Sequence, residues 1–259
     1  VVDIPNQPSG LGWMPDGSML IVSMLDRKVM KFKEGQLSVH ADLSKLTAFR
    51  CNDMVVDEIG NAYVGNFGSL YHAKNIKPTC LIFVNVNGDA KIIERNFDFP
   101  NGTVITPDGK KMIIGETYGG RLTSFDINSD GSLTNRQIWA QMMPTSYYLL
   151  TKIVRALKIP VKEGRATPYP VPDGICLDDH NGVWVASPTT SEVIRYTQGG
   201  EVTQRITTPD RAYACMLGGK TGTTLFISTA KTSDPEIASR EKNGKIYSTE
   251  VEYPRAGKP

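Results

Sequence analysis

The sequence repeats one short pattern five times along its length. In each copy, a segment typical of an inner strand is followed by a turn, a second apolar strand and a third strand. The clearest copies are residues 101–115 and 172–186. Self-similarity at a period of roughly 40–50 residues is typical of a β-propeller, in which each repeat forms one blade. The sequence therefore predicts an all-β chain with five visible blades.

The turns within the copies have the composition of tight hairpins. Pro15-Asp-Gly, Pro107-Asp-Gly and His180-Asn-Gly each separate strands rich in β-branched and aromatic residues, as hairpin strands usually are. The residues that open the inner strands of a propeller converge on a central channel. Three of these residues carry oxygen ligands, and we expect their side chains to meet at one axial point. They are Asn52, Asn101 and Asp173.

The length of 259 residues suits a single all-β domain, so we predict one propeller domain over 1–259. The linker between the third and fourth copies is about 25 residues longer than the period allows. We therefore predict a helical insertion at about 140–170, with a helix at 147–159. Ser146 is expected to cap this helix and Pro160 to end it.

The predicted helix is amphipathic, and several roles remain open for it. It could be a lid over the site, a dimer contact, a membrane-surface element, or a helix packed across the propeller top. Its apolar face contains Leu149, Leu150, Ile153, Val154 and Leu157, and its other face contains Lys152, Arg155 and Lys158.

Charge and hydropathy exclude several classes of function. The net charge is +2 and no lysine or arginine run is present, so a nucleic-acid partner is not expected. The sequence contains no run of about 18 apolar residues, so no membrane span is predicted. The first residues show no signal peptide, and the four cysteines form no C-x-x-C pair. We predict reduced, buried, structural thiols and a cytoplasmic location.

Four motifs, taken in order, resemble the SMP-30/gluconolactonase/LRE family. The resemblance covers essentially the whole chain. It implies a six-bladed propeller with a divalent metal in its central channel, so that the first blade is missing from these five repeats. The motifs are residues 52–57 with 60–64, 99–109, 172–178 and 214–219.

The resemblance also implies roles for particular residues. Asn101 corresponds to a metal ligand of the family, and Asp173 corresponds to a metal ligand that is also the proposed general base. Asn52 corresponds to a position at or near the metal and the substrate. Arg50 corresponds to a position where some members have an arginine that contacts the substrate. The family also uses a glutamate near the start of its first blade. The nearest segment, Ser9-Gly-Leu-Gly-Trp13, has serine and matches the element of the second blade better, so the glutamate-bearing blade is expected to be missing from this chain.

The residues themselves fit such a metal site. Amide and carboxylate oxygens are hard ligands that suit Ca²⁺, Mg²⁺ or Mn²⁺. Ca²⁺ is expected first, and Zn²⁺ is left open although the three histidines lack metal-ligand spacing. Asn-Gly and Asp-Gly are also turn dipeptides. However, Asn101 and Asp173 both precede an apolar strand, and each copy has a separate turn after it.

The expected function is a metal-dependent hydrolase that opens a lactone, either a sugar lactone or a related ester, by water attack at a metal-polarised carbonyl. Asp173 would position or deprotonate the water. The expected partner is therefore a small-molecule substrate. Two alternatives remain: a propeller that binds a small ligand or a partner without catalysis, and a phosphotriesterase-like hydrolase. Glu116 is expected at the surface, where most acidic side chains lie.

Overall fold

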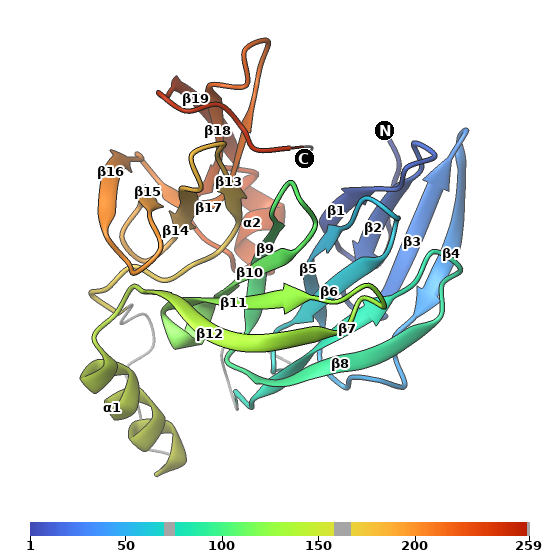
Figure 1. Cartoon of the computed structure of the whole chain (residues 1–259), viewed down its shortest axis with the longest axis horizontal. Coiled ribbons are helices and arrows are strands. Elements are labelled where there is room, and N and C mark those ends of the chain that lie inside the picture. Colours follow the sequence, from blue (N-terminus) through green and yellow to red (C-terminus); the bar gives the residue numbers. More distant parts are fainter. Residues whose placement is uncertain (70–75, 158–166, 258–259) are drawn as a thin grey trace. The chain divides into compact units, whose positions relative to one another are not determined.

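The computed structural model describes residues 1–69, 76–157 and 167–257. The strands of this part of the chain form five consecutive sheets, each built from strands that follow one another in the sequence (Figure 1). Pairing in the first, second, fourth and fifth sheets is antiparallel. The five sheets confirm the prediction of an all-β chain with five propeller blades.

The chain divides into two compact units. The first contains Val1–Ile114 and Ser124–Gln137, and the second contains Gly115–Thr123 and Ile138–Gly257. The first and second sheets belong to the first unit, and the fourth and fifth sheets belong to the second unit. The third sheet contributes strands to both.

Four strands build each of the first two sheets. The first contains β1 (Pro8–Trp13), β2 (Met19–Ser23), β3 (Lys28–Lys33) and β4 (Gln36–Asp42). The second contains β5 (Cys51–Val56), β6 (Ala62–Asn66), β7 (Thr79–Val84) and β8 (Ala90–Phe97).

The remaining sheets follow the same order, and three short helices connect their strands. The third contains β9 (Pro100–Ile105), β10 (Lys111–Glu116), β11 (Arg121–Ile127) and β12 (Leu133–Gln141), with the 3₁₀ turn η1 (Thr117–Gly119) after β10. The fourth contains β13 (Ile175–Leu177), β14 (Val183–Ser187), β15 (Glu192–Tyr196) and β16 (Val202–Thr207). The fifth contains β17 (Arg211–Gly218), β18 (Thr224–Ala230) and β19 (Lys245–Glu250), with α2 (Pro235–Glu241) between its last two strands. Helix α1 (Thr145–Ala156) follows β12.

The fourth strand of each four-stranded blade was not predicted from the sequence. In β16, five of the six residues are exposed and only Ile206 is half-buried. Its ladder with β15 holds it in the sheet, with Val193 opposite Ile206. A strand that buries almost nothing has no apolar alternation to reveal it.

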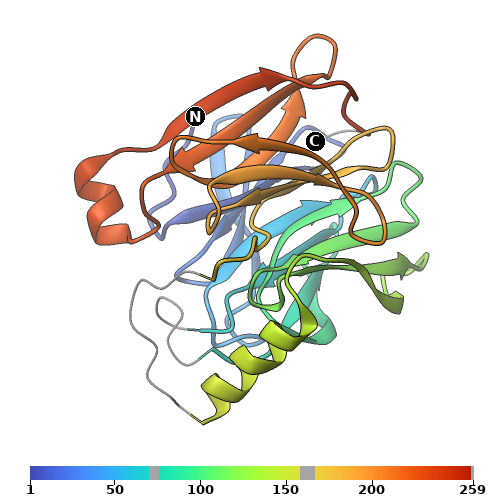
Figure 2. The same ribbon diagram turned by 90° about the vertical axis from the view of Figure 1, so that its left-hand side faces the viewer.

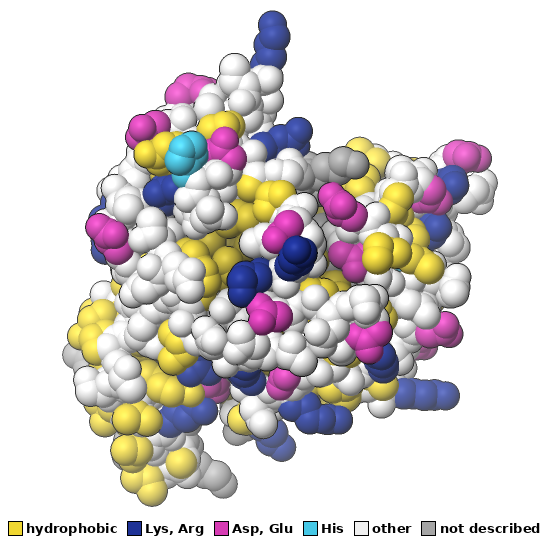
Figure 3. Space-filling model, in the orientation of Figure 1, with side chains coloured by type: hydrophobic (Ala, Val, Ile, Leu, Met, Phe, Trp, Pro, Cys, Tyr) yellow, Lys and Arg dark blue, Asp and Glu magenta, His cyan; other side chains and the backbone are white. Residues whose placement is uncertain are grey.

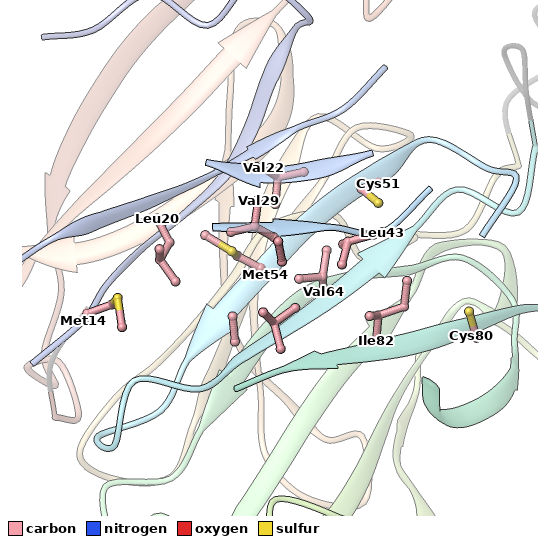
Figure 4. Close-up of a cluster of buried hydrophobic side chains, with 13 residues drawn as sticks. Met14, Leu20, Val22, Val29, Leu43, Cys51, Met54, Val64, Cys80 and Ile82 are labelled. Carbon is pink, nitrogen blue, oxygen red and sulfur yellow. The ribbon is translucent and has the colours of Figure 1, made fainter. Parts of the chain in front are cut away.

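Aliphatic side chains from two blades fill the main core of the first unit (Figure 4). Leu20 and Val22 of β2 enter it beside Val64 of β6, and all three are fully buried. Ile82 of β7 joins them. Fully burying such a side chain contributes about 1.5–3 kcal/mol. Consequently the middle strands of these blades read as nearly continuous apolar runs.

An ion pair lies inside the fourth blade of the second unit. Two guanidinium nitrogens of Arg195 donate to the Asp178 carboxylate, Nε at 2.6 Å and Nη2 at 3.0 Å. The Trp184 Nε1 donates to the same carboxylate at 3.1 Å, and the Gly182 backbone N–H donates at 2.9 Å. The neighbouring Asp178 carboxylate raises the pKa of Arg195. Asp178 thus joins the hairpin turn to the core of the blade.

Helix α1 lies within the range predicted for the insertion, about 140–170, but differs from the predicted helix in detail. It begins at Thr145 rather than Tyr147, so Ser146 lies within the helix and does not cap it. The last two predicted positions and Pro160 lie outside the described residues. Val154 was predicted on the apolar face and is half-buried, whereas the other four apolar residues of that face are exposed.

Helix α2 was not predicted. Asp234 caps it, because its side chain accepts from the backbone N–H groups of Glu236 and Ile237, and Pro235 occupies the first turn. None of the helices in the described part of the chain is long and apolar enough to cross a membrane. All four cysteines are free and buried, as predicted.

Candidate functional site

Two of the predicted ligands meet in the first unit. Asn52 lies on β5 and Asn101 on β9, and the Nδ2 of Asn52 donates to the Oδ1 of Asn101 at 2.8 Å. Both side chains are buried, with 8% and 3% of their surface exposed. The structure therefore brings together two amides that are 49 residues apart in the sequence.

The inner strand of the first blade supports this pair. The Ser9 hydroxyl on β1 donates to the Oδ1 of Asn52 at 3.1 Å. The next residue is Gly10, and a Cβ atom placed there would lie only 2.5 Å from the backbone nitrogen of Met54. Glycine is needed at this position because β1 and β5 approach each other so closely. This approach places Ser9 within reach of Asn52.

A β-bulge in β5 sets the direction of the Asn52 side chain. Cys51 pairs with Asn66 and Met54 pairs with Val64, so the two residues between them share one partner position. Cys51 and Met54 both enter the hydrophobic core, whereas Asn52 does not. The bulge therefore frees Asn52 from the strict alternation of the strand.

The second residue of this bulge is Asp53, which is half-buried. Its carboxylate accepts from the Met54 backbone N–H at 2.9 Å. Burial raises the pKa of Asp53 to about 6, and the hydrogen bond from Met54 partly offsets this rise. Asp53 is thus a carboxylate directly after Asn52 on β5. It was not predicted as a site residue, although it belongs to the motif at residues 52–57.

Asp173 lies in the second unit, directly before the short strand β13. Its backbone N–H donates to the Ala186 carbonyl at 2.9 Å, and the N–H of Gly174 donates to the Tyr213 carbonyl at 2.9 Å. A Cβ atom at Gly174 would lie 2.8 Å from the Cα of Ala214. Asp173 is therefore at the entry to the inner strand, and it is half-buried.

Neither Asn101 nor Asp173 forms a hairpin turn. The turn of the third blade closes later, where the Thr106 N–H donates to the Lys111 carbonyl at 2.9 Å. In the fourth blade, the Asp178 N–H donates to the Gly182 carbonyl at 2.9 Å. The alternative explanation of Asn101 and Asp173 as turn formers is therefore wrong.

The expectation of a surface role for Glu116 is also wrong. Glu116 is fully buried, and its two carboxylate oxygens accept from Nε and Nη2 of Arg121, each at 2.9 Å. The Thr123 hydroxyl donates to the same carboxylate. Desolvation of this acid is offset by the bidentate ion pair. The adjacent Thr117 hydroxyl donates to the Pro172 carbonyl at 2.8 Å, which links η1 to the residue before Asp173.

Arg50, the predicted substrate contact, lies directly before β5 and is half-buried. Its carbonyl accepts from the Phe67 N–H at 3.1 Å. It belongs to the first unit together with Asn52 and Asn101, whereas Asp173 belongs to the second. A shared point for all of them stays a prediction.

The donors of the amide pair suit a hard cation. Amide oxygens are typical ligands of Ca²⁺ and Mg²⁺ in proteins. Within residues 1–69, 76–157 and 167–257, no group of three or more His, Cys, Asp or Glu side chains gathers as a metal site. The cation site that fits these residues is accordingly one in which asparagine supplies part of the ligand set.

The five consecutive blades and the polar residues on their inner strands define a protein of the β-propeller class. The chain belongs to the SMP-30/gluconolactonase/LRE-like family, whose sequence profile matches residues 1–231. A 6-deoxy-6-sulfogluconolactonase from Pseudomonas putida is 24% identical over 81% of this chain and 65% of its own length. A diisopropyl-fluorophosphatase from Loligo vulgaris is 22% identical over 75% of this chain and 59% of its own length.

A solved structure shows the same fold. The calcium-binding protein regucalcin from Agrobacterium tumefaciens matches with a TM-score of 0.72 and 19% identity, over 98% of this chain and 79% of that protein. The chain thus spans less than two thirds of the length of each of these two relatives, and 79% of the length of the solved regucalcin. Family and fold are established by these matches.

Proposed function

We propose that this chain provides the site of a metal-dependent hydrolase that opens a lactone, either a sugar lactone or a related ester. The observation that supports this most directly is the buried contact between Asn52 and Asn101 on inner strands of consecutive blades. Membership of a family that includes a sulfogluconolactonase supports the substrate class. The reaction is attack of water on the lactone carbonyl, which opens the ring to a hydroxy acid.

Asn101 and Asp173 would hold the cation, with Asn52 and Asp53 beside it. When bound, the cation polarises the carbonyl and stabilises the negative charge that develops on its oxygen. Ca²⁺ is the first choice because the donors are hard oxygens, and the calcium-binding relative supports it. Mg²⁺ and Mn²⁺ suit the same donors, and Zn²⁺ has less support because it usually takes nitrogen or sulfur ligands.

The chain's own side chains divide the remaining work. The Nδ2 of Asn52 donates to the Asn101 Oδ1 and so fixes the orientation of that oxygen. Asp173 holds the attacking water and accepts its proton. Arg50 binds the substrate through its guanidinium group.

We also propose that Asp53 supplies a second carboxylate to this site. The equivalent second position of the other inner strands holds Gly10, Gly102, Gly174 and Ala214. The family's glutamate has no counterpart among these five repeats, so one negative charge is missing from the expected set. Because the number of charged ligands tunes Ca²⁺ affinity, a second carboxylate at Asp53 would restore it.

Calorimetric titration with Ca²⁺, together with a lactone hydrolysis assay, tests the proposal. We expect hydrolysis to stop when the metal is chelated and to return when Ca²⁺ is added back. Asp173→Asn should abolish hydrolysis, whereas Asp179→Asn, the same change at an exposed turn nearby, should leave it unaltered. Hydrolysis that survives both chelation and Asp173→Asn would refute the mechanism.

Two alternatives follow from specific observations. The resemblance to a diisopropyl-fluorophosphatase favours a phosphotriester as the second substrate class. The missing counterpart of the family's glutamate favours a propeller that binds a ligand without catalysis. Assaying the Ca²⁺-loaded protein on a lactone and on a phosphotriester separates the three, since the last alternative predicts metal binding without turnover of either.

The six-bladed architecture implied by the family resemblance also stays a proposal. Its support is the alignment with regucalcin, which covers 98% of this chain and 79% of that protein. Determining the sequence of the natural gene product tests it.

A further inference from the structure

Helix α1 turns its apolar side away from the rest of the second unit, to which it belongs. Its half-buried side chains are polar, aromatic or small aliphatic, and its large aliphatic ones are exposed. The half-buried side chains are Tyr147, Tyr148, Thr151 and Val154. The exposed ones, named here the α1 apolar strip, are Leu149 (53%), Leu150 (53%), Ile153 (54%) and Leu157 (66%).

The four residues of the strip form one continuous surface. With about 100° of rotation per residue, they fall within one arc of about 100°. Leu157 extends the helix by one residue, because its N–H donates to the Ile153 carbonyl at 2.9 Å. Figure 3 shows hydrophobic side chains gathered over α1. A surface helix normally packs such a stripe against its own core, and an exposed one indicates an interaction site.

Contacts on the opposite side of the helix fix this orientation. The Tyr147 ring lies 4.9 Å from that of Tyr169, at an interplanar angle of 65°. Arg121 and Lys152 lie over the Tyr148 ring, with their cationic groups 5.3 Å and 5.1 Å from its centroid. The helix therefore docks through its tyrosines and presents the strip outward. In Figures 1 and 2 it runs away from β12, the strand that precedes it.

Helix α1 carries a net positive charge. Helix α1 contains Lys152 and Arg155 and no acidic residue. In the sequence, no acidic residue occurs between Asp130 and Glu163. Glu116, at the end of β10, is buried and paired with Arg121, the residue that lies over the Tyr148 ring of α1. On the helical wheel, Lys152 lies about 60° from Leu149, at the edge of the strip.

We propose that the α1 apolar strip inserts into the surface of an anionic lipid bilayer. A helix that combines a leucine and isoleucine strip with a lysine at its edge matches the chemistry of the membrane interface, where apolar side chains enter the acyl region and cations bind lipid phosphates. The helix would lie in the plane of the membrane. This inference does not depend on the proposed hydrolase activity.

The charge and the size of the strip favour lipid over a second copy of the chain. Pairing two copies through α1 would bring like charges together, which opposes association. A standard protein–protein interface also takes about 20–30 residues from each partner, whereas the strip has four. A bilayer needs no such complementary surface.

Flotation of the full-length chain with lipid vesicles tests the proposal. We expect binding to vesicles of phosphatidylcholine mixed with phosphatidylglycerol, weaker binding to pure phosphatidylcholine, and loss of the difference at high salt. Leu150→Gln and Ile153→Gln should each weaken the partitioning roughly tenfold, because each removes one inserted side chain. Ile246→Gln on β19 is the matched control, since Ile246 is 74% exposed and lies outside the strip.

All three positions are exposed, so the thermal unfolding midpoints of these variants should match that of the parent chain. The proposal would be overturned if the parent chain bound neither vesicle type. It would also be overturned if Leu150→Gln and Ile153→Gln left the binding unchanged. A dimer in analytical ultracentrifugation that Ile153→Gln dissociates, without vesicle binding by the parent chain, would instead assign the strip to a second copy.

Discussion

The side-chain amide of Asn52 donates to the Oδ1 of Asn101 at 2.8 Å, and this contact joins the inner strands of the second and third blades. Both residues are buried, although asparagine is usually exposed. A buried amide is expensive unless its donors and acceptors have partners. The pair satisfies part of this requirement internally, and the Ser9 hydroxyl, which donates to the Oδ1 of Asn52, satisfies another part.

Replacing either asparagine should weaken Ca²⁺ binding. Asn101→Ala removes a proposed ligand, so we expect no measurable heat of binding in calorimetry. Asn52→Ala removes the group that orients Asn101, and we expect roughly 10–100-fold weaker affinity. Asn87→Ala, in the exposed turn between β7 and β8, is the matched control and should bind as the parent chain does. Equal affinity in all three variants would show that the amides do not serve a metal.

Asp178→Asn should destabilise the second unit strongly. The change leaves the buried guanidinium of Arg195 without its counter-charge, and such losses usually cost about 3–5 kcal/mol. The free energy of unfolding in urea measures this cost. Asp179→Asn, one residue further along and exposed, should change it by less than about 0.5 kcal/mol. A loss below about 1 kcal/mol for Asp178→Asn would mean that the pair contributes little.

Gly10→Ala should destabilise the first unit. Its Cβ would lie 2.5 Å from the Met54 backbone nitrogen and 2.9 Å from the Asp53 Cα, and backbone atoms cannot move aside cheaply. We expect a loss of about 1–3 kcal/mol in the free energy of unfolding. Because β5 carries Asn52, we also expect weaker Ca²⁺ binding.

The control for this substitution is Gly244→Ala. There, a Cβ atom would lie 3.9 Å from the Thr229 carbonyl oxygen, which is ordinary contact. Its free energy of unfolding should stay the same or rise slightly, since alanine has fewer unfolded conformations than glycine. If Gly10→Ala proved equally harmless, β1 and β5 would not need to approach so closely.

The thiols should be unreactive in the native protein. Burial raises the pKa of Cys51 to about 12 and raises the pKa values of Cys80 and Cys176. Below the pKa the thiol is neutral, and the thiolate is the form that reacts with alkylating agents. After iodoacetamide treatment of the native protein at about pH 8, mass spectrometry should find almost no labelled cysteine. The same treatment in guanidinium chloride should label all four. Rapid native labelling of Cys51 would contradict its burial.

The blade pattern was readable in the sequence because each inner and second strand buries apolar residues at regular intervals. Leu20 and Val64 are fully buried, and the turns between such strands carry Asp-Gly or Asn-Gly. The outer strands were not readable. β16 is a strand because β15 offers it a hydrogen-bonding edge, and its own side chains remain in water.

The candidate ligands were identified partly by residue type and mostly by resemblance to the family. Their contacts were not available from the sequence. Glu116 illustrates this limit, because its burial depends on Arg121, which approaches it through the geometry of η1. An acidic residue followed by a threonine and a tyrosine carries no sign of a buried ion pair.

The amino-acid order alone determined that this chain forms β-propeller blades, where most hairpins turn, and which amides and carboxylates open the inner strands. Those properties follow from local periodicity and turn chemistry, which a single segment carries within itself. Only the tertiary structure decided that Asn52 contacts Asn101, that Asp53 lies on a bulge, and that α1 faces outward with its leucines. Each of these depends on how closely segments distant in sequence approach, as at Gly10 against β5, and no single segment encodes that separation.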